Sequence, residues 1–412
     1  MALTTVRARL GGQWVTLTRN PATGRYEGVL TPPGTSIHQP GGYYSVEVEA
    51  SNGAGETASV SGARLASLRL AVRETAAPVL TLASPAPGYL ATGTPVFVFQ
   101  AVDEEGGSGV DPGTFAVSAD SGGMAGRGLR APQEIPGGYR FTWTPPEGWA
   151  DGAHTVTASV RDCDGNGSTV SGAYTVDTVP PELYIRRPYL RHVVDDEAVT
   201  VAGEARDVTA PDVTVTVGGT VVPVHGGRFE AAVPLEIGEN RIPVTAADGA
   251  GNQTTREVFM IRLVTDRTGA DADRVRELCA RGYARWTEEE RAWWASARCL
   301  RGSYDHRDLN RVGIAVDWLA GELRRRGYIA AVQPKTDWRK DDAPVRSQME
   351  AYLSGVETVR SAQGLYVTEI PKTMAGLTTG GANAIERALV EADAVFPKYS
   401  AWTAGEITCG GV

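Results

Sequence analysis

The stretch Val160-Arg-Asp-Cys-Asp-Gly-Asn166 lies between two runs of alternating apolar residues, and Ala246-Ala-Asp-Gly-Ala-Gly-Asn252 repeats it 86 residues later. In each stretch an aspartate can cap backbone N–H groups, and a glycine can supply a positive φ. The preceding run His154-Thr-Val-Thr-Ala-Ser-Val160 has the period of two that is typical of half-buried strands. The pattern predicts β-hairpins that recur along the chain.

A second repeat lies before each of these units. Glu74-Thr-Ala-Ala-Pro78 recurs 103 residues later as Asp177-Thr-Val-Pro-Pro181, and each copy precedes an apolar strand. Proline stiffens a linker and suits the start of an edge strand. One β-sandwich has about 100 residues, so the spacing predicts three β units. We place them at residues 1–76, 77–178 and 179–264.

These hairpins, together with the loop Asp103-Glu-Glu-Gly-Gly-Ser-Gly-Val-Asp-Pro112, resemble the Ig-like domains common in bacterial surface and phage proteins. The resemblance covers roughly residues 1–264 and implies tandem β-sandwiches. The first unit begins without an obvious first strand, so it is either incomplete or borrows a strand from a neighbour. Such sandwiches support many unrelated functions, so the resemblance implies no activity.

After Val264 apolar residues fall three and four apart, which is the helical period. Asp271 and Asp305 are candidate N-caps, and Thr287 with Glu290 forms a capping box. Further helices are predicted near residues 342–344 and after residue 378. The predicted fold class is therefore mainly β with a C-terminal α region, either a short helical bundle or an oligomeric helical segment.

The predicted helices carry apolar stripes on one face. The stripe positions include Leu309, Val312, Val316, Leu319, Leu323, Met349, Val356, Ile385 and Leu389. Such helices are not stable alone in water, and the sandwiches offer no obvious partner for them. We therefore expect residues 265–397 to form a docking or oligomerisation module, followed by a tail at residues 398–412.

The run Tyr304-Asp-His-Arg-Asp-Leu-Asn-Arg-Val312, the segment Trp338-Arg-Lys-Asp-Asp-Ala-Pro344 and the tail Trp402-Thr-Ala-Gly-Glu-Ile407 are found together in this last third. They resemble the C-terminal helical modules of tail, baseplate and fibre-associated proteins in phages and prophages of Gram-positive bacteria. The resemblance implies a structural role in the virion tail after assembly in the host cytoplasm. It also implies other tail proteins as partners, and it names no catalytic residue.

Composition excludes several classes of function. The net charge of −9 argues against a nucleic-acid binder, which carries a basic face. No apolar run approaches the ~20 residues of a membrane span. The N-terminus lacks the charged-then-apolar pattern of a signal peptide, so we expect a chain made in a cytoplasm.

Motifs for catalysis are not found. The five histidines have no metal-binding spacing, and no nucleophile elbow or phosphate-binding loop occurs in a suitable context. His306 lies between Asp305 and Asp308; this is either a catalytic dyad or, as we favour, the acidic first turn of a helix. We therefore predict a protein that is not an enzyme and has no cofactor.

Asp162, Asp164 and Asn166 resemble the first ligands of a Ca²⁺ loop, but Ala173 occupies the position where an EF-hand has its bidentate glutamate. A turn capped by its own side chains is favoured, and a metal site remains the alternative. The acidic segment 103–111 presents a similar, weaker case.

Two further pairs of alternatives concern cysteines and aromatic residues. Cys279 and Cys299 both fall in predicted helices, where free thiols are favoured over a disulfide. Tryptophans at helical spacing, such as Trp286 and Trp318, are more often core than a carbohydrate platform. Sugar binding fits better on sandwich loops, where the tyrosines Tyr43, Tyr44, Tyr89 and Tyr189 lie.

The expected function is that of a non-enzymatic structural component of a phage or phage-like tail, an Ig-like arm with a helical anchor that oligomerises. The first alternative is a host-adsorption protein that binds cell-surface polysaccharide through its sandwich loops. The second is a surface adhesin or an accessory module of a secreted enzyme.

Overall fold

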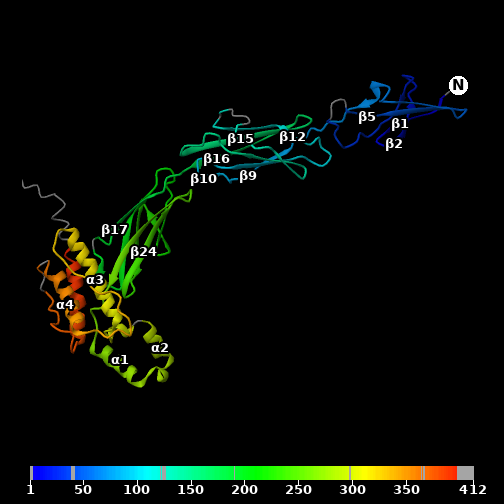
Figure 1. Ribbon diagram of the computed structural model, residues 1–412. Coiled ribbons are helices and arrows are strands. Elements are labelled where there is room, and N and C mark those ends of the chain that lie inside the picture. The colour runs from blue at the N-terminus through cyan, green and yellow to red at the C-terminus, as the bar shows by residue number, and fades with distance from the viewer. Residues whose placement is uncertain are drawn as a thin grey trace, which may run out of the picture. The chain divides into compact units, whose positions relative to one another are not determined.

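The computed structural model describes residues 3–38, 42–120, 122, 127–189, 191–296, 298–362, 364 and 367–396. The predicted tail at 398–412 lies outside these residues. The chain divides into two units, Met1–Val179 and Pro180–Val412. The β-strands lie before residue 263 and the α-helices lie after it (Figure 1). This order confirms the predicted class, which is mainly β with a C-terminal α region.

The first unit begins with an N-terminal β region, residues 3–70, built on one four-stranded antiparallel sheet. Its order is β2-β1-β6-β7, with β1 (Leu3–Leu10), β2 (Gln13–Thr16), β6 (Glu47–Asn52) and β7 (Thr57–Ser61). Two short pairs join β3 (Thr18–Arg19) to β4 (Tyr26–Glu27) and β5 (Tyr44–Ser45) to β8 (Arg69–Leu70), and η1 (Ala66–Leu68) precedes β8. Along β1, Val6, Ala8 and Leu10 are buried while their neighbours are exposed, as the period of a strand requires.

The second sandwich packs two four-stranded sheets around an aromatic core. The first sheet has the order β10-β16-β15-β12, with β10 (Gly88–Leu90), β12 (Val110–Ala119), β15 (Gly152–Asp162) and β16 (Gly167–Val176). The second has the order β13-β14-β11-β9, with β9 (Val79–Ser84), β11 (Phe97–Val102), β13 (Gln133–Ile135) and β14 (Gly138–Trp143). Phe115 and Phe141 stack at 4.0 Å inside it, and the Trp143 indole donates to the Arg127 carbonyl.

The third sandwich lies in the second unit and also packs two sheets around a hydrophobic core. One sheet has the order β17-β19-β23-β22, with β17 (Glu182–Arg187), β19 (Ala198–Arg206), β22 (Val224–His225) and β23 (Arg228–Pro234). The other has the order β18-β25-β24-β20-β21, with β18 (Val193–Val194), β20 (Thr214–Val217), β21 (Thr220–Val222), β24 (Gly238–Ala247) and β25 (Gln253–Arg262). Val201, Val215, Val244 and Met260 are fully buried between the sheets.

The predicted hairpins are confirmed. Asp162 accepts hydrogen bonds from both the backbone and the side-chain nitrogen of Asn166 at 2.8 Å, and Asp248 accepts the same two from Asn252 at 2.9 Å. Gly165 and Gly251 have φ of 100° and 94°, which favours glycine. The turn therefore closes through its own side chains in both copies.

In the described part of the chain after β25 there are five α-helices: α1 (Gly269–Arg281), α2 (Glu288–Ala295), α3 (His306–Arg325), α4 (Arg346–Ser361) and α5 (Thr379–Asp393). The short turns η2 (Tyr283–Arg285) and η3 (Arg298–Arg301) lie on either side of α2. The capping box of Thr287 with Glu290 and the N-cap at Asp305 are confirmed. Asp271 is not the N-cap of α1 as predicted, because Thr268 occupies that position and Asp271 completes its capping box from the third helical residue.

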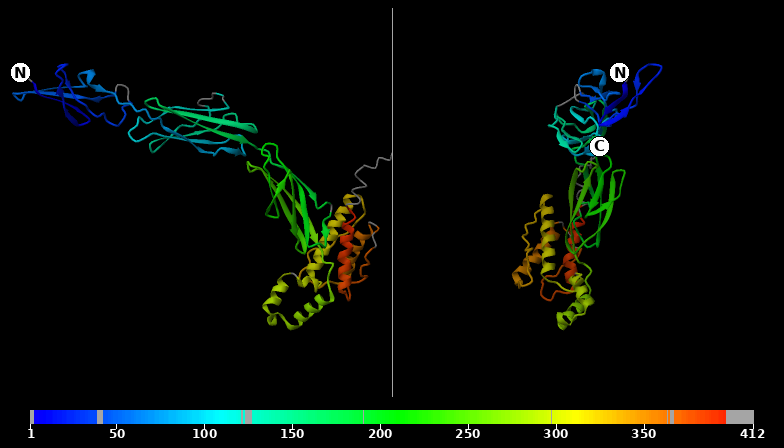
Figure 2. Two further views of the ribbon diagram at one scale, coloured as in Figure 1. Left: turned by 180° about the vertical axis from the view of Figure 1, so that it is seen from behind. Right: turned by 90° about the vertical axis from the view of Figure 1, so that its right-hand side faces the viewer.

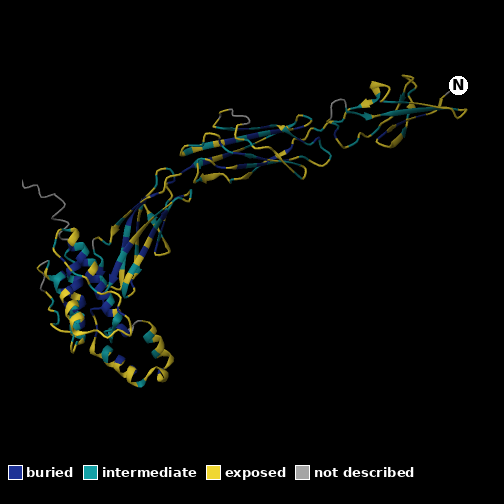
Figure 3. Ribbon diagram, in the orientation of Figure 1, coloured by how far each residue is buried: buried dark blue, intermediate teal, exposed yellow. Residues whose placement is uncertain are grey.

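Helices α3, α4 and α5 share one hydrophobic core with the third sandwich. Ile261 on β25, Leu263 just after it and Val193 on β18 pack with buried residues of these helices. In both views of Figure 2 these helices lie beside one end of that sandwich, and Figure 3 shows many buried residues on them. The expectation that the apolar stripes lack a partner among the sandwiches is therefore wrong.

Candidate functional site

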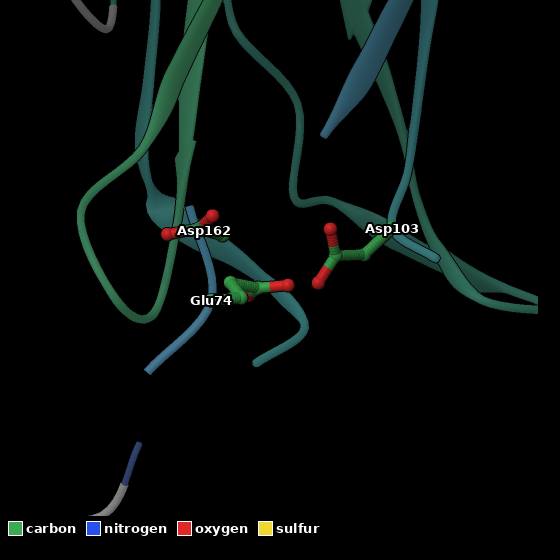
Figure 4. A group of neighbouring side chains, drawn as sticks. All are labelled: Glu74, Asp103 and Asp162. Carbon is green, nitrogen blue, oxygen red and sulfur yellow. The ribbon is translucent and has the colours of Figure 1, made fainter. Parts of the chain in front are cut away.

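Three acidic side chains meet at one end of the second sandwich. Glu74 comes from the linker between β8 and β9, Asp103 follows β11, and Asp162 is the last residue of β15. One carboxylate oxygen from each lies within 4.8 Å of the others. We call this group the acidic cluster; Figure 4 shows the carboxylates of Glu74 and Asp103 facing each other, with Asp162 beside them.

Backbone N–H groups hold two of these carboxylates in place. Ser108 donates to Glu74 Oε1 at 2.5 Å, and Gly109 donates to Asp103 Oδ2 at 2.6 Å. The third carboxylate, that of Asp162, is fixed by its two bonds from Asn166. Each acid is thus anchored by short hydrogen bonds from a neighbouring turn, in a position set by the backbone.

The acidic cluster has no positive partner. Among the described residues, no lysine, arginine or histidine forms an ion pair with Glu74, Asp103 or Asp162. Glu74 and Asp103 are half-buried, and Asp162 is only 2% exposed. Like charges held this close repel each other, and the hydrogen bonds from the backbone offset part of that repulsion.

Neighbouring pKa values reflect this concentration of negative charge. A hydrogen bond to the Glu74 side chain raises the pKa of Glu104. Burial raises the pKa of the Cys163 thiol, and the charges of Asp111 and Asp162 raise it further. A cation placed in the acidic cluster would relieve the repulsion among these groups.

The acidic cluster also lies where the N-terminal β region meets the second sandwich. Ser36 donates its backbone N–H to the Gly106 carbonyl at 2.9 Å and its hydroxyl to Asp164. The Glu74 backbone N–H donates to Asp164 at 3.1 Å, and Asn166 donates to the Glu74 carbonyl at 3.2 Å. The linker, the 103–109 loop and the 162–166 hairpin are therefore joined at one point.

Only part of this arrangement was predictable from the sequence. Asp162 and Asp103 belong to the acidic cluster, but Asp164 and Asn166 are engaged in hydrogen bonds that hold the junction. Glu105 is exposed, and Asp111 caps Gly113 at 2.9 Å. The sequence patterns did not place Glu74 beside these acids, although its position in the repeated linker was a usable signal.

The nine predicted docking residues lie mostly in the interior. Leu309, Val312, Val316, Leu319, Leu323, Val356, Ile385 and Leu389 are buried, and Met349 is half-buried. They pack within one chain, so they do not form an apolar seam open to solvent. Leu309 and Met349 also line a groove of about 840 Å³ together with Leu353, Met374 and Leu377. Among the described residues, Met349 is the one predicted docking residue that is partly exposed in this groove.

A buried ion network ties the helices to the chain that leaves β25. Arg267 bonds Asp308 at 2.8 Å and Glu386 at 2.6 Å, and Arg311 bonds the same two acids at 2.6 and 2.7 Å. Burial acts to raise the pKa of Glu386, but the charges of Arg311 and Arg267 outweigh it and lower that pKa. The Val264 N–H also donates to Glu386. Asp305 and His306 thus lie at the start of α3, and Asp308 belongs to the buried ion network.

Cysteines and tryptophans take the structural roles that were favoured. Cys279 is a free, exposed thiol and Cys299 is a free, buried one. Trp286 is 8% exposed and donates its indole N–H to the Leu278 carbonyl at 2.7 Å, so it is a core residue. Tyr89 and Tyr189 are largely exposed on their sandwiches. None of the described helices is long and apolar enough to cross a membrane.

Comparisons with known proteins find one family model and one curated relative, each over a part of the chain. Residues 181–262, in the third sandwich, match the family described as glucodextranase, domain B. Bacillopeptidase F of Bacillus subtilis (strain 168) is 36% identical over 109 residues, which is 26% of this chain and 7% of that protein. The chain therefore spans only a small part of the length of this curated relative.

Solved structures of tandem β modules are also similar. The fibronectin(III)-like modules of Clostridium thermocellum CbhA have a TM-score of 0.32 and 18% identity, covering 45% of this chain and 94% of that one. Sidekick-1 immunoglobulin domains 1–4 have a TM-score of 0.26 and 15% identity, covering 63% of this chain and 67% of that one. These likenesses concern the fold alone. The sheets and helices of the structure itself show a chain of β-sandwich modules followed by helices.

Proposed function

We propose that this chain is a non-enzymatic structural component of a phage or phage-like tail. The observation that carries the proposal concerns the run from Tyr304 to Val312, which is the most specific part of the resemblance to tail-associated proteins. Several residues of this run have structural roles. Asp305 caps α3, Asp308 and Arg311 form the buried ion network, and Leu309 and Val312 are buried apolar residues. These residues build a folded end unit, as expected of a protein whose role is assembly.

In this proposal the β modules of the first unit form an arm, and the third sandwich with its helices forms the end that docks on other tail proteins. Tandem Ig-like modules suit an arm because each of the two sandwiches buries its own core. The helical end suits docking because the groove leaves the half-buried apolar side chains of Met349, Met374 and Leu377 accessible.

The test is to look for the chain in purified particles. Particles induced from the source strain are separated on a density gradient, analysed by mass spectrometry and labelled with an antibody against this chain. We expect a fixed copy number per particle and label confined to the tail. Recovery of the chain only from cell envelopes or particle-free supernatant would overturn the proposal.

A second candidate function is an accessory module that holds a protein on cell-surface polysaccharide. The match of residues 181–262 to a domain of glucodextranase and the similarity to bacillopeptidase F favour it. Exposed Tyr189 is a candidate sugar-stacking residue. Co-sedimentation of the full chain with purified cell walls, lost in Tyr189→Ala and kept in Tyr283→Ala, would support this function. No co-sedimentation would exclude it.

A further inference from the structure

We propose that the solvent-facing side of one sheet of the third sandwich binds an anionic polysaccharide, whose sugars carry carboxylate groups. The sheet consists of β17, β19, β23 and β22, and this side of it carries a hollow of about 790 Å³. We call the charged side chains at this hollow the arginine face: Arg186, Arg187, Arg206, Arg228, Glu204 and Glu230. The proposal does not depend on whether the chain belongs to a virion.

The strand register brings these side chains to one side of the sheet. Ala205 packs into the core of the sandwich, so Glu204 before it points to the opposite side. Glu204 lies opposite Tyr184 on β17 and opposite Arg228 on β23. Residues paired in this way have neighbouring side chains. Tyr184, Glu204 and Arg228 therefore form a row across three adjacent strands.

One glutamate holds three arginines of this face in position. Arg186 and Arg228 lie 3.1 and 3.4 Å from the Glu204 carboxylate. Arg206 lies 3.5 Å from it. The hydrogen bond from Arg186 lowers the pKa of Glu204, which keeps this acid ionised. The arginines are largely exposed, and each guanidinium has five N–H donors, so a single carboxylate leaves most of these donors free for a ligand.

The charge of the arginine face is opposite to that of the whole chain. The chain has a net charge of −9, whereas this face has four arginines and two glutamates. Glu182, which lies opposite Arg206 in the register, still leaves the face positive. A positive face on an acidic chain attracts anions, and arginine suits carboxylates because it donates two parallel hydrogen bonds. The ligand class that this face selects is therefore anionic.

The groups around the arginines favour a saccharide over a simple anion. Tyr184 is largely exposed in the same row, so its ring is open to stacking on a sugar. Glu230 and His225 are exposed at the hollow and offer hydrogen bonds to sugar hydroxyls. The volume of the hollow falls within the range of about 300–1,000 Å³ that is usual for ligand sites. An acidic sugar uses the arginines, the aromatic ring and the hydroxyl-binding groups together.

This site differs from that of the second candidate function, where Tyr189 is the candidate stacking residue and the charge of the polysaccharide is not specified. The arginine face requires a charged ligand and makes Tyr184 the stacking residue. Variants of the two tyrosines therefore separate the two sites. Failure of one site leaves the other unaffected.

Calorimetric titration of the full chain with oligogalacturonate, and with a neutral oligoglucan of the same length, tests the proposal. We expect binding of the oligogalacturonate alone, with an affinity that falls as NaCl is raised from about 50 to about 500 mM. Arg228→Gln should weaken this binding about tenfold. Tyr184→Ala should weaken it about fivefold.

The controls are matched in residue type. Arg256→Gln removes an exposed arginine from β25 in the other sheet of the same sandwich and should leave the affinity unchanged. Tyr189→Ala should leave it unchanged as well. Oligogalacturonate binding that is lost in Tyr189→Ala and kept in Tyr184→Ala would overturn the proposal and favour the second candidate function.

Hydrogen–deuterium exchange of the wild-type chain is a readout that needs no variant to fold. Oligogalacturonate should slow exchange in residues 184–187, 202–206 and 225–230, and it should leave β25 unchanged. Protection confined to other segments would overturn the proposal. So would an absence of binding at millimolar concentration, or equal affinity for the neutral oligoglucan. Equal affinity for an oligonucleotide of the same charge would also overturn it, because it would show a general anion surface instead of a saccharide site.

Discussion

Asn383 in α5 and Arg267 in the segment after β25 form a reciprocal pair of hydrogen bonds. The Arg267 backbone N–H donates to Asn383 Oδ1 at 3.0 Å, and Asn383 Nδ2 donates to the Arg267 carbonyl at 2.9 Å. One amide side chain thus satisfies both backbone groups of a residue that is 5% exposed. The pair holds the segment that follows β25 against α5 and so connects the third sandwich to the helices.

Asn383→Ala should destabilise the second unit by about 1–3 kcal/mol, because it leaves two buried backbone groups without partners. Chemical denaturation followed by tryptophan fluorescence and circular dichroism measures this change. Asn20→Ala, which alters a turn in the first unit, is the matched control and should leave the transition of the second unit unchanged. Equal transitions for wild type and Asn383→Ala would show that the pair does not support the fold.

The buried ion network predicts a larger effect. Glu386→Gln leaves Arg267 and Arg311 with a single buried carboxylate, so we expect a loss of about 3–5 kcal/mol in the free energy of unfolding. Glu391→Gln on the same helix keeps its acceptor for the Thr368 hydroxyl and should cost far less. Urea titration compares the two. Because the charges interact, Arg311→Met combined with Glu386→Gln should cost less than the sum of the single changes.

Asp393 makes the stability of the second unit depend on pH. Burial raises its pKa to about 7, although the backbone N–H groups of Val193 and His192 donate to it. Arg191 lowers this pKa and Glu322 raises it. Between about pH 4 and pH 7 the folded chain keeps a proton that the unfolded chain has lost. The free energy of unfolding therefore falls as pH rises through this window, by at most about 1.4 kcal/mol per pH unit.

Denaturation at pH 5 and at pH 8 measures this dependence. Asp393→Asn keeps the acceptor for both N–H groups and has no proton to lose. Its stability should change less between the two pH values, and it should exceed that of the wild type at pH 8. A wild-type chain whose second unit is more stable at pH 8 than at pH 5 would contradict the assignment.

Local features were predictable from the sequence, and long-range ones were not. The hairpin at Asp162 and the capping box at Thr287 depend on residues at most four apart, so their side chains reveal them directly. The acidic cluster joins Glu74 to Asp162, 88 positions later, and only the folded linker brings them together. The stripe on α3 was correctly recognised as apolar, but no periodicity reveals that its partners include Ile261 on β25.

Variants in the groove beside α4 can test docking without disturbing the fold. The buried stripe residues cannot test docking, since Leu319→Ala removes core packing and should cost about 2–5 kcal/mol in stability. Met349 is half-buried in the groove, so Met349→Asp should leave the second unit folded while it weakens association with tail proteins at least tenfold. Val345→Asp is the matched control: Val345 is exposed at the N-cap of α4, where aspartate is favourable. Light scattering and co-sedimentation with particles compare the two variants, and equal association would remove the groove from the docking surface.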